Sequence, residues 1–198
     1  MERFGQFLNV IDVEATCWEG PPPPGQVSEI IEIGLCVVDV ESRRRVARHR
    51  MLIRPARSVV SAFCTELTGL TQSEVEGGVE FWEACALLER DHWSRSRAWA
   101  SWGDYDRKQF ERQCSAGRVS YPFSSRHTNA KQAFTGCFGL HRKLGMSAAL
   151  DHAGLALEGR HHSGADDAWN IAALILKIIS CEGWPDSEEN VLRPTGRL

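Results

Sequence analysis

Three stretches near the start of the chain have the hydrophobic pattern of β-strands. Residues 7–12 and 28–40 are mainly apolar runs, and residues 45–55 mix basic and apolar positions. Short runs rich in valine and isoleucine are typical of strands. The segment "GPPPPG" at 20–25 excludes a helix or a central strand, because proline lacks an amide hydrogen and fixes its backbone angle. Three successive strands with short links predict an antiparallel meander.

The rest of the chain has mainly the periodicity of helices. In "VEFWEACALLERDHW" the apolar residues recur at three- and four-residue intervals, as they do on one face of a helix. After the meander, the pattern predicts short helices within 61–77, helices over 79–93, 104–117, 146–155 and 166–180, a strand over 96–103, and a strand followed by a helix ending at Gly145 within 126–145. This order predicts an α/β fold, in which helices flank a mixed central sheet made of the antiparallel meander and parallel strands.

The size and composition fit one globular domain. The chain has 198 residues, of which 42% are apolar and 25% charged, which is enough for a single hydrophobic core. We expect one domain over residues 1–183 and a weakly ordered tail over residues 184–198. The sequence shows neither a signal-peptide pattern nor an apolar run of membrane-spanning length, so we expect no membrane partner.

The cysteines and the net charge bear on the cellular setting. Seven cysteines are scattered along the chain without a C-x-x-C pair, which argues against a zinc site and against a disulfide framework. We therefore expect reduced thiols in a cytoplasmic protein. The net charge of −3 indicates no strong basic field for nucleic acid, but leaves a local basic patch open.

Two acidic residues interrupt the first apolar run. Asp12 and Glu14 are two positions apart in "FLNVIDVEATCWE", so on a strand both side chains point to the same face. Two carboxylates this close in a half-buried place repel each other, and one takes up a proton unless a cation neutralises the pair. A divalent cation is one interpretation. The other is that the strand ends at Asp12 and that both acids are solvated in a turn.

Two later stretches place acids and histidines near the start of a predicted helix. "SWGDYDRKQF" has Asp104 and Asp106 directly after an apolar strand, and "HHSGADDAWNIA" has two histidines before a pair of acids. Each stretch has a purely structural alternative, because acids favour the first turn of a helix and histidines also occur in surface loops. Taken with Asp12 and Glu14, the stretches predict one cluster at the strand ends.

Such a cluster suits metal-assisted hydrolysis of a phosphodiester. Four carboxylates can hold two Mg²⁺ ions, which activate a water molecule and stabilise the leaving oxygen. Hard oxygen ligands favour Mg²⁺, with Mn²⁺ as a substitute, over zinc. A histidine that titrates near neutral pH can take the proton of the attacking water.

The motifs, in this order, resemble those of the DEDDh 3′→5′ exonucleases of the ribonuclease-H-like superfamily. Within that family the chain is most similar to the group of histone-mRNA and small-RNA 3′ exonucleases and KapD-like proteins. The resemblance covers about residues 9–178 and rests on "IDVEATCWEG" with "SEIIEIG", on "FCTELTGLT", on "WGDYDRKQF" and on "HHSGADDAWNIA". It implies a ribonuclease-H-like fold and a 3′→5′ exonuclease activity.

The resemblance also implies a catalytic set without a departure at any of its five positions. His162 would be the general base, and Asp12 would bridge two metal ions. The implied metal ligands are Asp12, Glu14, Asp106 and Asp167.

The second motif offers two acids for one role. In the family, a large apolar residue follows the acid after three intervening residues. Phe110 satisfies this spacing for Asp106, whereas Lys108 stands at the same distance from Asp104. The resemblance therefore favours Asp106.

The third motif offers two pairs with the same spacing, His161–Asp166 and His162–Asp167. The metal ligand of the family is usually the second acid of the doublet, followed by a small residue. Ala168 fits that role, so we choose the second pair. Asp166 is then predicted to be a helix-start residue.

The substrate site implied by the resemblance is a pocket for the 3′-terminal nucleotide. Phe63 and Tyr105 would stack on the terminal base, and the backbone around Ala15 and Thr16 would line the pocket together with Leu70. Stacking tolerates every base because each has a π-face. For Phe63 a place in the core is the alternative.

These inferences predict a metal-dependent 3′→5′ exonuclease that acts on single-stranded RNA with some activity on DNA, and that releases nucleoside 5′-monophosphates. A DNA exonuclease for repair or proofreading is the second hypothesis. A non-catalytic module that binds nucleic acid is the third, and the intact set of acids speaks against it.

Overall fold

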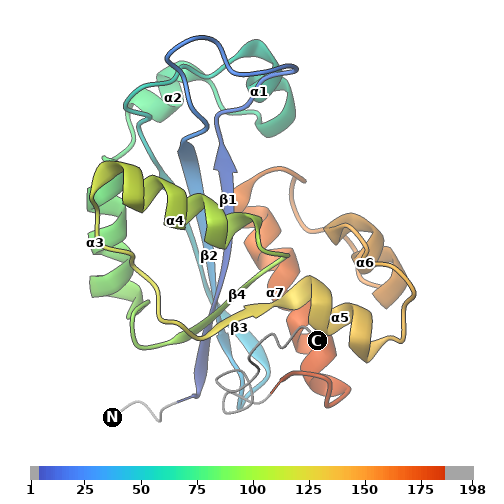
Figure 1. Ribbon diagram of the computed structural model, residues 1–198. Helices are drawn as coiled ribbons and strands as arrows, with labels where there is room; N and C mark the ends of the chain where they lie inside the picture. Colours follow the sequence, from blue (N-terminus) through green and yellow to red (C-terminus); the bar gives the residue numbers. More distant parts are fainter. Residues whose placement is uncertain (1–4, 186–198) are drawn as a thin grey trace, which may run out of the picture.

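A five-stranded mixed sheet with helices on both faces forms the body of the computed structural model, which describes residues 5–185 (Figure 1). The order across the sheet is β3-β2-β1-β4-β5, with the first three strands antiparallel and the last two parallel to β1. The strands are β1 (Phe7–Ala15), β2 (Ile30–Asp39), β3 (Arg44–Leu52), β4 (Ala98–Ser101) and β5 (His127–Asn129). The predicted mixed sheet is confirmed, including the meander and the parallel strands.

The helices divide between the two faces and one end of the sheet. In Figure 1, α3 and α4 lie across one face, α7 lies behind the sheet with α5 and α6 beside it, and α1 and α2 lie beyond the end to which β1 points. Their bounds are α1 (Ala62–Thr68), α2 (Gln72–Glu76), α3 (Phe81–His92), α4 (Tyr105–Gly117), α5 (Ala130–Cys137), α6 (Met146–Ala153) and α7 (Gly164–Ser180). None of these helices is both long and apolar enough to cross a bilayer.

The alternation of side chains along β1 builds a separate core on each face. Leu8 and Val10 pack with the helices α5 to α7, whereas Ile11 packs with α3 and α4. Helix α7 contributes most to the first core through fully buried apolar side chains spaced three and four residues apart, each of which stabilises the fold by ~1.5–3 kcal/mol. These side chains are Ile171, Leu174, Ile175 and Ile178.

Two boundaries differ clearly from the prediction. Strand β1 runs to Ala15 because its last residues pair with β2, so Glu14 lies within the strand and not beyond its end. Helix α5 ends at Cys137 instead of Gly145, since the chain turns at Gly139, whose φ is +60°. The tail predicted over 184–198 lies outside the described residues except for its first two positions.

Candidate active site

The pairing of β1 with β2 brings three carboxylates to one end of the α7 face. Asp12 lies opposite Gly34 and Glu14 lies opposite Glu32. Side chains on a strand alternate, so Asp12 and Glu14 follow Leu8 and Val10 on the face that α7 covers. The fold therefore buries acids where the same strand face otherwise carries aliphatic side chains.

The first turn of α7 adds a fourth carboxylate to this group. The turn comes very close to β2, since a Cβ built on Gly34 would lie 1.9 Å from the carbonyl oxygen of Gly164. Only a residue without a side chain fits such an approach. Glu32 fixes the contact further, because its Oε1 accepts a hydrogen bond from the Ala165 amide at 3.2 Å. Asp167 is thereby placed over Asp12 and Glu14.

Asp106, in the first turn of α4, reaches the group from the other face of the sheet, past an edge of β1 that has no neighbouring strand in the described part of the chain. Strand β4 pairs only with residues 8–10 of β1, so on that side the end of β1 has no strand neighbour among the described residues. Oδ1 of Asp106 accepts a hydrogen bond from the Val13 amide at 3.0 Å. The carboxylate therefore replaces a missing strand, which explains why an acid is buried at the start of α4.

The acids share one cavity of about 320 Å³. Single ligand atoms of Asp12, Glu14 and Asp167 all lie within 4.8 Å of one another, and Asp106 lines the same cavity. Glu14, Asp106 and Asp167 are at most 8% exposed. The other residues that line it are Val13, Ala15, Cys17, Leu67, Trp102, Tyr105, Lys131, Gly145, Met146, His161 and His162.

The electrostatics of the cavity are unfavourable without a cation. Burial, then the neighbouring carboxylates, raise the pKa of Asp12 well above its usual range, and the same causes raise the pKa of Glu14 to about 8. Burial raises the pKa of Asp106 to about 6, although the Val13 amide partly offsets it, and burial also raises the pKa of Asp167. Several carboxylates therefore resist ionisation at neutral pH.

The residues present fit a divalent cation. The donors are carboxylate oxygens, which hard ions such as Mg²⁺ prefer, and positive charge would remove the repulsion that raises their pKa values. The orphaned oxygen of Glu32 supports the same conclusion, because its Oε2 is buried without a hydrogen-bond partner among the described residues. Glu32 also raises the pKa of Asp12 and Glu14, which places its charge near the group.

The two histidines have different roles in the structure. Nδ1 of His161 lies 3.0 Å from Oδ2 of Asp167, and the backbone amide of His162 donates to the same oxygen at 3.0 Å. The His162 imidazole stacks on that of His161, with ring centroids 4.0 Å apart, and no described residue hydrogen-bonds to it. Burial and the nearby positive groups lower the pKa of His162. Its assignment as general base stays a prediction.

The residues predicted to bind the nucleotide are only partly brought together. Tyr105 and Ala15 line the cavity. Phe63, 40% exposed, does not line it, but lies one helical turn before Leu67, which does. Thr16 and Leu70 are buried. The Thr16 hydroxyl accepts from the Glu29 amide and donates to the Val27 carbonyl, so it closes the loop between β1 and β2.

Several side chains at the site were not predicted from the sequence, and three of them are charged or lie beside a predicted residue. Glu32 was part of the quoted "SEIIEIG", and its position opposite Glu14 follows from the register of the meander. Leu67 follows Phe63 by four residues, which is one turn of α1. Lys131 carried no signal in the sequence, because it reaches the cavity through the packing of α5 near Gly103.

Fold and site together define a class of protein, the ribonuclease-H-like exonucleases of DEDDh type. The chain belongs to the exonuclease (RNase_T) family, which matches residues 10–175. The family assignment made from the motifs is thus confirmed, and the chain contains a 3′→5′ exonuclease domain of this metal-dependent family.

Similar proteins act on nucleic acid, by the names they carry. The chain is 30% identical to the 3′-5′ exonuclease Snipper of Drosophila melanogaster over 87% of this chain and 69% of that protein. It is 28% identical to 3′-5′ exoribonuclease 1 of Rattus norvegicus over 92% of this chain. The nuclease domain of 3′hExo, a DEDDh family member bound to rAMP, is 26% identical with a TM-score of 0.79, over 91% of this chain and 94% of that domain.

The chain corresponds to only part of some of its relatives. The chain spans 56% of the rat exoribonuclease and 55% of the human one.

Proposed function

We propose that the protein hydrolyses single-stranded RNA from a free 3′ end, with weaker activity on DNA, and releases nucleoside 5′-monophosphates. The observation that carries this proposal is the convergence of Asp12, Glu14 and Asp167 within 4.8 Å, in one cavity with Asp106 and two histidines. A cavity of about 320 Å³ has the size of a small-ligand site and suits one terminal nucleotide better than a duplex.

The four acids would hold the metal, for which we propose Mg²⁺, with Mn²⁺ as a substitute. When held by these acids, divalent ions would supply an activated water molecule and would stabilise the leaving 3′ oxygen. The lowered pKa of His162 favours its neutral form, and a neutral imidazole can accept the proton of the attacking water. Glu14 can accept a hydrogen bond from the 3′ hydroxyl of the substrate, which would account for a requirement for a free 3′ end.

The preference for RNA rests on the relatives. One of them is named an exoribonuclease, and a related 3′-exonuclease with 26% identity and a TM-score of 0.79 recognises the 3′ end of a histone mRNA stem-loop. The wall formed by Tyr105 and Leu67 offers stacking and apolar contact, which tolerate any base. We therefore propose little sequence preference.

The decisive experiment compares RNA and DNA strands of the same sequence, labelled at the 5′ end. With Mg²⁺ the RNA should shorten stepwise from its 3′ end, and the products should be 5′-monophosphates. EDTA should stop the reaction and added Mg²⁺ should restore it. An RNA ending in a 3′ phosphate serves as the matched substrate that should resist.

Two results would contradict the proposal. Faster digestion of the DNA strand would favour a DNA exonuclease. Binding of RNA without release of nucleotides under Mg²⁺ and Mn²⁺ would favour a non-catalytic module. The variant Asp12→Ala controls for contaminating nuclease, since it should be inactive when purified in the same way.

We also propose a cytoplasmic, reducing location. All seven cysteines are free thiols in the structure, as expected where disulfides do not persist. Imaging of the tagged protein in its own cell would test this.

A further inference from the structure

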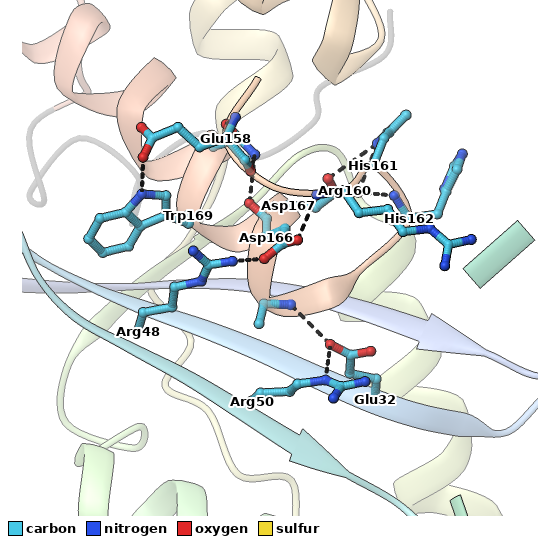
Figure 2. A network of polar contacts seen from close by, with 12 residues as sticks. Glu32, Arg48, Arg50, Glu158, Arg160, His161, His162, Asp166, Asp167 and Trp169 are labelled. Atoms are coloured by element: carbon cyan, nitrogen blue, oxygen red, sulfur yellow. Dashed lines mark hydrogen bonds and ion pairs between the residues drawn. The ribbon is translucent and has the colours of Figure 1, made fainter. Parts of the chain in front are cut away.

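The loop before α7, residues 158–163, carries both histidines and is held by polar contacts from α7 (Figure 2). Asn170 accepts from the Glu158 amide at 3.0 Å and donates to the Glu158 carbonyl at 2.9 Å. Asp167 accepts from the His162 amide. Between these two contacts, Oδ2 of Asp166 accepts from the Arg160 amide at 2.7 Å.

The side chain of Asp166 binds the loop and does not cap its own helix. Helix α7 has no side-chain hydrogen bond at its N-cap, Ser163, so Asp166 lies at the helix start as predicted but does not cap it. Its carboxylate forms an ion pair with Arg48 of the edge strand β3, which Figure 2 marks with a dashed line. The loop backbone lies against it, since a Cβ on Gly159 would be 2.3 Å from Oδ2.

The side chain of Arg160 points the other way, towards α1. Its Nη2 donates to the carbonyl oxygens of Glu66 and Leu67, both at 3.3 Å. These carbonyls belong to the last turn of α1, where helices have unpaired acceptors and favour a positive group. Gly69 ends the helix with φ of +77°, and a Cβ there would collide with the Arg160 guanidinium. Helix α1 is thus tied to the loop at the residue, Leu67, that lines the cavity.

We propose that Arg160 is a positioning residue that sets the distance between the histidine loop and the nucleotide-binding wall of α1. Its backbone amide, held by Asp166, fixes the loop. Its guanidinium fixes α1 and hence Leu67. The inference rests on the proposed function, because it takes the loop as the catalytic side and α1 as the binding side of one cavity.

The two contacts of Arg160 are separable and act on different kinetic constants. Arg160→Ala removes the guanidinium and leaves the loop amide in place. The KM for RNA should therefore rise about tenfold, which is the effect of one charged hydrogen bond, while kcat changes less than about threefold. Arg160→Lys should restore most of the affinity, because an ammonium group can donate to the same carbonyls.

Asp166→Ala removes the carboxylate that accepts a hydrogen bond from the Arg160 amide. It leaves the contact between the Arg160 side chain and α1 in place. Here kcat should fall about tenfold with little change in KM, because misplacement of a catalytic group slows the reaction more than it weakens binding. Asp166→Asn keeps an acceptor for the Arg160 amide and should keep most of kcat. Arg90→Ala is the matched control for Arg160→Ala. Arg90 is an arginine that forms an ion pair with an aspartate, Asp91, on the exposed surface of α3.

A direct binding measurement keeps the inference separate from the proposed function. Calorimetry with AMP in the presence of Mn²⁺ should show weaker binding to Arg160→Ala, most of the wild-type affinity in Arg160→Lys, and wild-type affinity in Arg90→Ala. A wild-type protein that binds AMP but degrades nothing would overturn the proposed function. An Arg160→Ala protein that melts at a lower temperature but keeps its KM and its AMP affinity would overturn the inference.

Discussion

Gly34 of β2 and Gly164 of α7 are in a contact that leaves no room for a side chain, since a Cβ on Gly34 would lie 1.9 Å from the Gly164 carbonyl oxygen. Gly34 is the partner of Asp12 in the sheet, and Gly164 begins the turn that carries Asp167. The contact therefore fixes the distance between two carboxylates that are far apart in the chain.

The first prediction follows from this contact. Gly34→Ala should push the start of α7 away from the sheet. The free energy of unfolding should fall by ~1–3 kcal/mol, as it does when a core is overpacked. Nuclease activity should fall at least about a hundredfold, because small displacements of catalytic groups have effects of this size. Chemical denaturation and RNA digestion would measure both.

A glycine in open space provides the control. A Cβ on Gly136 of α5 meets nothing within 4 Å, so Gly136→Ala should keep full activity and should stabilise the helix by up to ~1 kcal/mol. Equal behaviour of the two alanine variants would show that the contact at Gly34 does not position the site.

The example of Gly34 also shows what could be predicted from the sequence. The shared face of Asp12 and Glu14 follows from periodicity alone, because side chains on a strand alternate. The order of the elements, and with it the mixed sheet, follows from the same patterns. The approach of Gly34 to Gly164 depends on how closely α7 packs, which no local pattern encodes.

The parts of the site that were missed depend on packing between distant segments. Lys131 enters the cavity from α5, and Arg160 reaches α1 over more than ninety positions of the chain. The end of α5 was placed too late because the apolar periodicity continues past Cys137, while the turn at Gly139 depends on a positive φ that the pattern does not reveal. The acids were predictable because they stand in short motifs with local spacing.

The second prediction concerns the charge of the acidic group. Asp12→Asn should abolish cleavage, because it removes a metal ligand. It should also raise the melting temperature of the metal-free protein, because it replaces a buried carboxyl group whose ionisation is opposed by burial and by the neighbouring carboxylates. Addition of Mg²⁺ or Mn²⁺ should stabilise the wild type and not the variant. Thermal melts with and without each ion measure this, and a variant that gains as much stability from Mg²⁺ as the wild type would contradict it.

The third prediction is the pH dependence of the metal-free protein. The folded pKa of Glu14 is about 8, above that of a carboxyl in an unfolded chain, so the folded state binds more protons between these two values. Stability should therefore fall as pH rises from about 4.5 to about 8, and divalent cations should reverse the loss at the upper end. Melting temperatures across this range in EDTA would test it, and a rise towards pH 8 would argue against buried, mutually repelling acids.

The fourth prediction separates two aromatic residues. Tyr105 lines the cavity, whereas Phe63 does not. Loss of base stacking costs ~1–3 kcal/mol per base, so Tyr105→Ala should raise the KM for RNA about tenfold, whereas Phe63→Ala should change it less than about threefold. The reverse order, measured under the same conditions, would mean that α1 closes onto the substrate and brings Phe63 to the base.

The fifth prediction distinguishes the neighbouring histidines. His161 holds Asp167 through Nδ1, whereas the His162 imidazole has no hydrogen-bond partner among the described residues. His162→Ala should therefore lower kcat by ~10²–10⁴, as loss of a general base does, and leave Mn²⁺ binding intact. His161→Ala should mainly change metal affinity, since it frees the Asp167 carboxylate.

Because the pKa of His162 is lowered, the wild-type rate should rise with pH below the usual histidine range and level off near neutrality. If His161→Ala produced the large loss in kcat and His162→Ala only a change in metal affinity, the general base would be His161.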